Sequence, residues 1–111
     1  DHVLVRLSER VGRVVRRHEM FFRFGGDEFA ILVPDSEPPS LEELARRVVA
    51  VVAETRFELG GQSIAVTVSV GLACYPQDAD HVAGLMAAAD EAMYRAKGAG
   101  RNRWLGQERA E

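Results

Sequence analysis

Apolar residues recur at intervals of three and four positions in three stretches of the chain, which is the spacing of one helix face. The first stretch covers residues 1–18, where arginines stand between apolar residues such as Leu7 and Val11. The second and third stretches cover residues 41–52 and 82–96. The pattern therefore predicts three amphipathic helices, each with one face against a core.

Polar residues and glycines indicate where the later two helices begin and end. Ser40, with Glu43 three positions later, has the form of a capping box that opens a helix. Asp80 is expected to cap the third helix, and Gly98 and Gly100 to end it. The side chains expected to be buried are Leu41, Leu44, Ala45, Val48 and Val52 in the second helix, and Val82, Leu85, Met86, Ala89, Met93 and Ala96 in the third.

Two glycine pairs separate short apolar runs and predict two β-hairpins. The flanking runs are residues 21–24 and 29–33 for Gly25-Gly26-Asp27-Glu28, and residues 57–59 and 62–73 for Gly60-Gly61. A last short strand is expected at residues 102–105. The order of helix, hairpin, helix, hairpin, helix and short strand predicts an α+β sandwich, with helices on an antiparallel-rich sheet.

Composition narrows the class of protein. The chain has 111 residues, 47% hydrophobic and 28% charged, which is typical of one globular domain and excludes a fibrous repeat. Its longest apolar run, residues 82–89, is far shorter than the roughly 20 residues of a membrane helix. The single cysteine, Cys74, cannot form an internal disulfide, which indicates a reducing compartment and favours a buried apolar role.

The formal net charge is −3, but two segments of the chain are basic. One lies in residues 1–24, and the other, residues 95–103, contains Arg95, Lys97, Arg101 and Arg103 with no acid among them. Local basic clusters in an acidic chain suit a small phosphorylated ligand better than a nucleic acid, which usually needs a broad basic face. Solvated helix faces explain the same composition, and composition alone leaves both explanations open.

The tip of the first hairpin carries candidate chemistry. Gly25 and Gly26 allow the phosphates of a ligand to approach the backbone closely. Asp27 and Glu28 follow at once, and neighbouring carboxylates on a tight turn suit Mg²⁺, a hard cation that takes oxygen ligands. An ordinary exposed turn is the alternative, and it would be favoured if this tetrapeptide stood alone.

Three segments in the same order strengthen the functional interpretation. They are residues 23–29 (RFGGDEF), residues 67–71 (TVSVG), and residues 89–97 (ADEAMYRAK) followed by 100–103 (GRNR). They resemble the signature loop, the core strand and the C-terminal helix with its basic turn in GGDEF domains, the diguanylate cyclases that condense two GTP into cyclic di-GMP. The resemblance covers residues 1–105 and leaves residues 106–111 as a tail.

The resemblance implies a fold, an activity and partners. The fold would be a palm-like sandwich akin to nucleotide cyclases and polymerases, with helices around a central sheet. The activity would be diguanylate cyclase, with release of pyrophosphate and with Mg²⁺ or Mn²⁺ as cofactor, in bacterial second-messenger signalling. Catalysis would need a homodimer in the cytoplasm, with GTP as substrate, cyclic di-GMP as product and inhibitor, and no nucleic-acid or membrane contact by this domain.

Roles follow from the resemblance residue by residue. Asp27 would be a metal ligand and the base for the attacking 3′-hydroxyl, and Glu28 would ligate or orient the metal. Gly25 and Gly26 would pass under the α- and β-phosphates, Lys97 and Arg101 would bind the γ-phosphate, and Asp1 would contact guanine. Lys97 and Arg101 are four positions apart, so they share a helix face if the last turn persists, or Arg101 is donated from a loop. A basic helix end, and for Asp1 an acidic helix start, are the structural alternatives.

The product-inhibition site of the family has an arginine, two variable residues and an aspartate. The matching residues here are Arg16 and Glu19, with Arg47 of the next helix as the auxiliary arginine. Glutamate displaces the acceptor by about one methylene, so weaker inhibition is expected. An exposed arginine-rich helix end remains an equal alternative.

One part of the family pattern does not precede Asp1. Family members open with a strand that carries a metal-binding aspartate, then phenylalanine-lysine and asparagine-aspartate segments. The chain is therefore expected to be part of a longer protein with a sensory module upstream, and to be weakly active alone. The alternative function is an inactive GGDEF module that binds GTP or cyclic di-GMP and regulates a linked domain.

Overall fold

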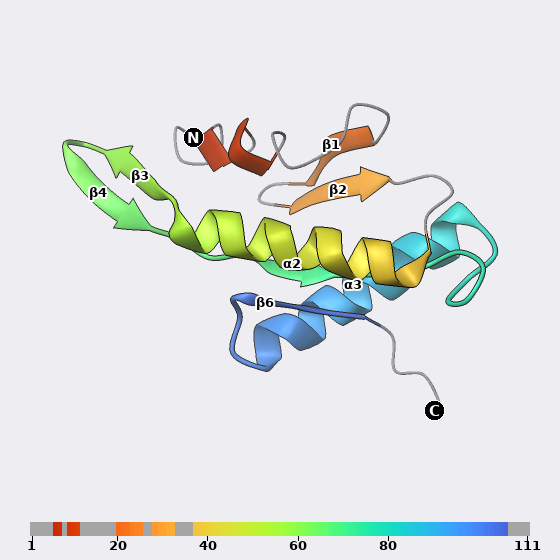
Figure 1. Ribbon diagram of the computed structural model, residues 1–111. Coiled ribbons are helices and arrows are strands. Elements are labelled where there is room, and N and C mark those ends of the chain that lie inside the picture. Colours follow the sequence, from red (N-terminus) through yellow and green to blue (C-terminus); the bar gives the residue numbers. More distant parts are fainter. Residues whose placement is uncertain (1–5, 8, 12–19, 26–27, 33–36, 107–111) are drawn as a thin grey trace.

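A computed structural model describes residues 6–7, 9–11, 20–25, 28–32 and 37–106, with the backbone path alone for 20–25 and 28–32. Residues 6–7 and 9–11 are helical. The elements that follow are β1 (Met20–Gly25), β2 (Glu28–Leu32), α2 (Pro38–Glu54), β3 (Arg56–Leu59), β4 (Gln62–Ala65), β5 (Ser69–Gly71), α3 (Val82–Gly98) and β6 (Arg103–Leu105) (Figure 1).

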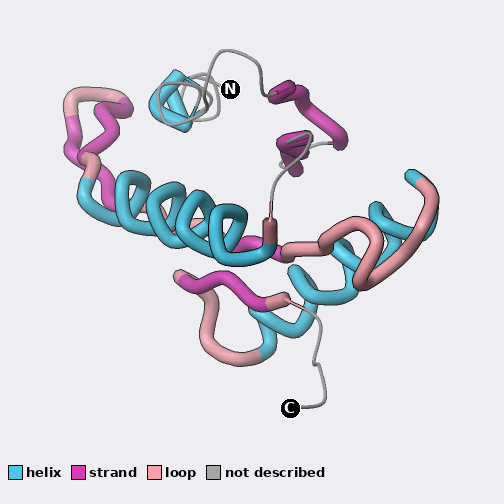
Figure 2. The backbone as a smooth tube through the Cα atoms, turned by 45° about the vertical axis from the view of Figure 1, so that its right-hand side comes forward, coloured by secondary structure: helices cyan, strands magenta, loops and turns pink. Residues whose placement is uncertain are grey.

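The fold is α+β, as predicted, and the described strands pair in three two-stranded sheets. Both predicted hairpins are present, since β1 pairs with β2 and β3 with β4, each antiparallel. The run at residues 62–73 does not form one strand, because β4 ends at Ala65 and β5 pairs in parallel with β6. A parallel pair needs a long crossover connection, and α3 supplies it (Figure 2).

The predicted capping box at Ser40 is wrong. Helix α2 begins at Pro38, with Glu37 as its N-cap and no side-chain cap. Proline suits the first helical position because it lacks the amide hydrogen that would be left unpaired there. The Ser40 amide already donates to the Glu37 carbonyl, at 3.0 Å, so Ser40 lies inside the first turn.

The predicted cap of the third helix is also wrong. The N-cap of α3 is His81 and makes no side-chain cap. Asp80 Oδ1 instead lies 2.9 Å from His81 Nδ1, so the carboxylate pairs with the neighbouring ring. The helix does end at Gly98, as the glycines predict.

The core joins the N-terminal helical residues to α2 and β3. Leu7, Val11, Val48, Val52 and Phe57 form one buried cluster. The stripe predicted for α2 is confirmed, with Ala45, Val48 and Val52 buried and Leu44 packed against the cluster. Cys74 is also buried, as expected.

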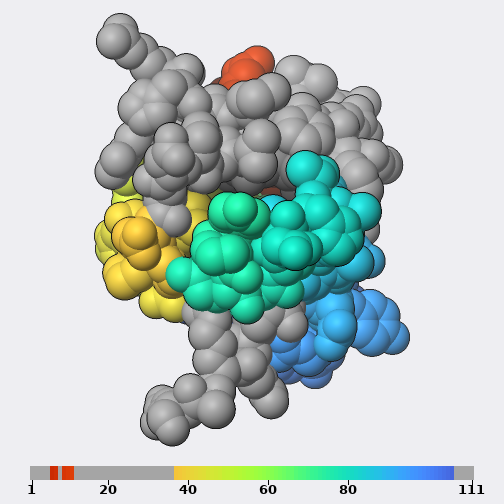
Figure 3. All heavy atoms as spheres, turned by 90° about the vertical axis from the view of Figure 1, so that its right-hand side faces the viewer, coloured from red at the N-terminus to blue at the C-terminus, as the bar shows by residue number. Residues whose placement is uncertain are grey.

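The stripe predicted for α3 is only partly correct. Of the predicted residues, Ala96 is fully buried and Val82 is 71% exposed, and the fully buried Ala92 was not predicted. The reason is the position of β5, whose last residue, Gly71, meets the helix at Ala89 and Met93. Val82 lies about two turns earlier, beyond the strand. Figure 3 shows the connection before α3, in green and cyan, between α2 in yellow and the later part of α3 in blue.

Candidate functional site

The tip of the β1–β2 hairpin places the glycine and carboxylate positions next to each other. Gly25 pairs with Glu28 across the two strands, so Gly26 and Asp27 are the two residues that connect them. The register shifts between Arg23 and Gly25, which marks a β-bulge beside the tip. Bulges commonly re-aim the chain next to functional sites. In this register the carboxylate-bearing positions 27 and 28 follow each other at the point where β2 begins.

Several predicted site residues lie outside the described residues and are not placed: Asp1, Arg16, Glu19, Gly26 and Asp27. For Gly25 and Glu28 the structure gives the strand pairing. Arg47, Lys97 and Arg101 are described with their surroundings. Among the residues whose side chains are described, no group of three or more His, Cys, Asp or Glu could hold a metal ion.

The end of α3 turns sharply, and this turn decides where Arg101 lies. The Arg101 amide donates to the Ala96 carbonyl at 3.0 Å, and the Gly100 amide to the Lys97 carbonyl at 3.4 Å. Gly100 has φ +122°, a conformation that glycine adopts without the steric cost of a Cβ. These are the bonds of a Schellman motif, which closes a helix and reverses the chain.

Arg101 therefore lies in a loop and not on the helix. Its φ is +62°, in the left-handed region, so it does not continue the face that carries Lys97. Lys97 is half-buried in the last turn of α3, and Arg101 is exposed in the loop. Of the two positions considered for Arg101, the structure shows the one in a loop.

The other two basic residues of this cluster, Arg95 and Arg103, stabilise the turn through hydrogen bonds to backbone carbonyls. The Arg95 guanidinium donates to the Gly106 carbonyl at 2.8 Å, and Arg103 Nε donates to the Arg101 carbonyl at 3.0 Å. Lys97 and Arg101 make no side-chain hydrogen bond or ion pair with any residue that the structure describes. Within the described part of the chain, their charged ends are not paired.

Arg47 is exposed on α2. The preceding residue, Arg46, is committed to Glu43, because Arg46 Nε donates to Glu43 Oε2 at 3.0 Å and a second guanidinium nitrogen reaches Glu43 Oε1. The hydrogen bond from Arg46 lowers the pKa of the Glu43 carboxyl. Arg47 has no such partner within the described part of the chain, and it is the only one of the three predicted product-site residues whose surroundings the structure describes.

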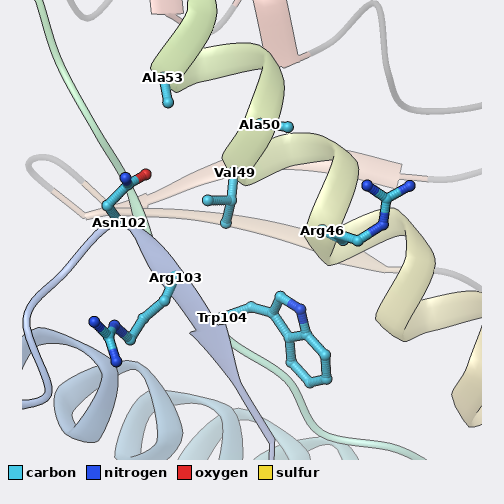
Figure 4. A pocket seen from close by; sticks show the side chains of 7 residues that line it. All are labelled: Arg46, Val49, Ala50, Ala53, Asn102, Arg103 and Trp104. Carbon is cyan, nitrogen blue, oxygen red and sulfur yellow. The ribbon is translucent and has the colours of Figure 1, made fainter.

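A groove of about 390 Å³, not predicted from the sequence, lies between α2 and β6. Its lining residues are Arg46, Val49, Ala50, Ala53, Asn102, Arg103 and Trp104 (Figure 4). None of the predicted site residues lines it. The spacing of Arg46, Val49, Ala50 and Ala53 could have indicated a second face on α2, since it follows the helical repeat.

The family is established by comparison. The model of the family described as diguanylate cyclase, GGDEF domain, matches residues 1–103. The chain belongs to the GGDEF domain family.

Relatives and solved structures agree with this assignment. MucR of Pseudomonas aeruginosa, a bifunctional diguanylate cyclase and cyclic di-GMP phosphodiesterase, is 35% identical over 102 residues, covering 92% of this chain and 15% of MucR. The response regulator PleD of Caulobacter vibrioides is 31% identical over 109 residues, covering 96% of this chain and 24% of PleD. The crystal structure of the GGDEF domain of TpbB from Pseudomonas aeruginosa has a TM-score of 0.90 at 33% identity, covering 99% of this chain and 69% of that one.

The chain spans less than a third of the length of these curated relatives. In the described residues, no helix is long and apolar enough to cross a membrane.

Proposed function

We propose that this chain is the catalytic domain of a diguanylate cyclase that condenses two GTP into cyclic di-GMP. The observation that carries the proposal is the pairing of Gly25 with Glu28, which supports a two-residue tip with neighbouring carboxylates at positions 27 and 28. Relatives named as diguanylate cyclases support the same activity, among them DgcP and TpbB of Pseudomonas aeruginosa, 32% and 34% identical to this chain.

Asp27 and Glu28 fit a divalent cation, Mg²⁺ or Mn²⁺, because such cations prefer carboxylate oxygens and often share their ligands with substrate phosphates. A cation bound there would neutralise charge that builds up on the phosphates during transfer. The strand register supports this fit, since it puts positions 27 and 28 in succession at the end of the hairpin.

The residues of the chain would then act on GTP in distinct ways. The backbone at Gly25 and Gly26 passes under the α- and β-phosphates, and Asp27 accepts the proton of the 3′-hydroxyl that attacks the α-phosphate of the second GTP. Pyrophosphate leaves as the new phosphodiester bond forms. Lys97 and Arg101 bind the γ-phosphate with charges that no described side chain neutralises, and Asp1 contacts guanine.

Catalysis would need two copies of the domain, each presenting one GTP to the other, in the cytoplasm where GTP is available. Cyclic di-GMP would inhibit the enzyme by binding to Arg16, Glu19 and Arg47. The exposure of Arg47 and its lack of a described ion-pair partner support a role in binding an anion.

A second candidate is a domain that binds GTP or cyclic di-GMP without turnover and regulates a linked domain. NbdA of Pseudomonas aeruginosa, named as a cyclic di-GMP phosphodiesterase, is 32% identical over 102 residues. Segments like this chain therefore also occur in proteins named for the opposite activity.

Turnover by the full-length protein that contains this domain separates the two candidates. With GTP and Mg²⁺, chromatography should show one cyclic di-GMP and two pyrophosphates formed from two GTP, and EDTA should stop the reaction. Lys97→Ala should raise KM for GTP about tenfold or more, the value of a hydrogen bond to a charged group. Arg56→Ala, at an exposed arginine of β3, is the control and should leave KM unchanged. Binding of GTP or cyclic di-GMP without turnover would favour the second candidate, and binding of neither would contradict both.

A further inference from the structure

The contact between α3 and β5 is closer than any side chain would allow. A Cβ added at Gly71 would overlap the Ala89 carbonyl oxygen and the Met93 amide nitrogen, and would lie 2.9 Å from Met93 Cα. All three are backbone atoms of α3, so no side-chain rotation can relieve the overlap. Gly71 thus sets how closely the helix approaches the strand.

The same residue also faces the strand that follows α3. Gly71 is in register with Leu105 in the parallel pair of β5 and β6, and the Leu72 amide donates to the Leu105 carbonyl at 2.9 Å. The loop that holds Arg101 connects α3 to β6 (Figure 1). Gly71 therefore contacts the element before this loop and pairs with the element after it.

Lys97 lies one helical turn after Met93, so a displacement at Met93 is carried directly to Lys97. An ordinary van der Waals contact of a Cβ begins near 3.4 Å, so α3 would have to retreat from β5 by about 1 Å or more to accept one. Close-packed interiors do not absorb such a change locally. A misplacement of about 1 Å in a binding group can cost on the order of 10²-fold in function.

We propose that Gly71 is a positioning residue that sets the placement of Lys97 on α3 relative to Arg101 in the following loop, and so adjusts the site for a triphosphate. This inference rests on the proposed function, in which these two side chains bind the γ-phosphate of GTP. It assigns to Gly71 the selectivity for nucleoside triphosphates over nucleoside monophosphates.

The test compares GTP with GMP, which lacks the γ-phosphate, by calorimetric titration of the full-length protein. Gly71→Ala should weaken GTP binding about tenfold or more and change GMP binding less than about twofold, because only the γ-phosphate contacts are displaced. The matched control is Gly98→Ala, on the same helix, where an added Cβ meets no atom within 4 Å. It should bind both nucleotides like the wild type.

A milder variant guards against loss of the fold. Ala92 is fully buried on α3, the helix that packs on β5 and β6, so the larger side chain in Ala92→Val should also shift α3 and lower the ratio of GTP to GMP affinity. Circular dichroism shows up to which temperature each variant stays folded.

The outcomes separate this inference from the proposed function. Equal losses for GTP and GMP in folded Gly71→Ala, an unchanged ratio, or failure of both variants to fold would show that Gly71 has a structural role only. If Lys97→Ala itself leaves the ratio unchanged, the assignment of the γ-phosphate site fails. A selective loss in Lys97→Ala without one in Gly71→Ala overturns the positioning role alone.

Discussion

The two hairpins are both antiparallel strand pairs, and they carry different residues between their strands. Gly25 pairs with Glu28 in the first, and Leu59 pairs with Gln62 in the second. Each register leaves two connecting residues, Gly26-Asp27 and Gly60-Gly61. The first tip adds a bulge and two successive carboxylates, which the second lacks. A glycine-containing hairpin is thus a common structural element, and its chemistry depends on the residues placed beside the glycines.

The second hairpin is attached to the hydrophobic core through a single buried side chain, that of Phe57. Phe57 is 3% exposed and belongs to the core cluster, whereas the other residues of β3 are exposed. Leu59, next to the tip, is 45% exposed. This hairpin extends away from the rest of the molecule in Figure 1, and its tip has no buried side chain. We therefore expect changes at the second tip to affect local stability alone.

The largest expected effect is on catalysis at the first tip. Asp27→Ala should lower cyclic di-GMP synthesis about 10²- to 10⁴-fold, since it removes the proposed base and metal ligand. Gly61→Asp places a carboxylate at the equivalent position of the second tip and should leave turnover unchanged. Initial rates with GTP, together with melting temperatures, measure both. Near wild-type turnover by a folded Asp27→Ala variant would contradict the functional difference between the hairpins.

Phe57, the buried residue of the second hairpin, should make a large contribution to the free energy of unfolding. Phe57→Ala should lower the free energy of unfolding by about 3 to 5 kcal/mol, the usual cost of removing a buried aromatic ring. Leu59→Ala, two positions along the same strand, is the control and should cost less than about 0.5 kcal/mol. Denaturant titration measures both. Similar losses in the two variants would mean that the hairpin is held by its whole surface and not by one residue.

The smallest expected effect is strain at the second tip. Gly60 has φ +58° and Gly61 φ +80°, and a Cβ at either would meet no atom within 4 Å. Gly60→Ala should therefore cost about 1 to 2 kcal/mol from backbone conformation alone. Gly60→Asn, which tolerates the left-handed region better, should cost less. Equal stability of the two variants by thermal unfolding would rule out backbone strain as the reason for glycine here.

Some features were predictable because they depend on neighbours in the chain. The α2 stripe follows from helical spacing around Ala45, Val48 and Val52, and both hairpins follow from apolar runs beside glycine pairs. The family follows from short motifs, chief among them residues 23–29, and the family model confirms it over residues 1–103. The roles of Asp27, Glu28 and the other site residues stay predictions.

Other features could not be predicted from local patterns in the sequence. Ser40 and Glu43 have the form of a capping box, but Pro38 opens the helix two residues earlier. Val82 fits the repeat of α3 and is nevertheless exposed, whereas Gly71 of β5 meets this helix further along, at Ala89 and Met93. The helical repeat identifies a face, but not how much of the face another element covers.

The sequence by itself determined the presence of the helices and of the two hairpins, and the family, because each of these depends on residues within a few positions of one another. The tertiary structure decided that β5 pairs in parallel with β6 and that Gly71 lies against the backbone of α3. These outcomes depend on contacts between residues that are far apart in the sequence. Spacing along the chain carries no record of those contacts, so they emerge only when the helix packs on the strand.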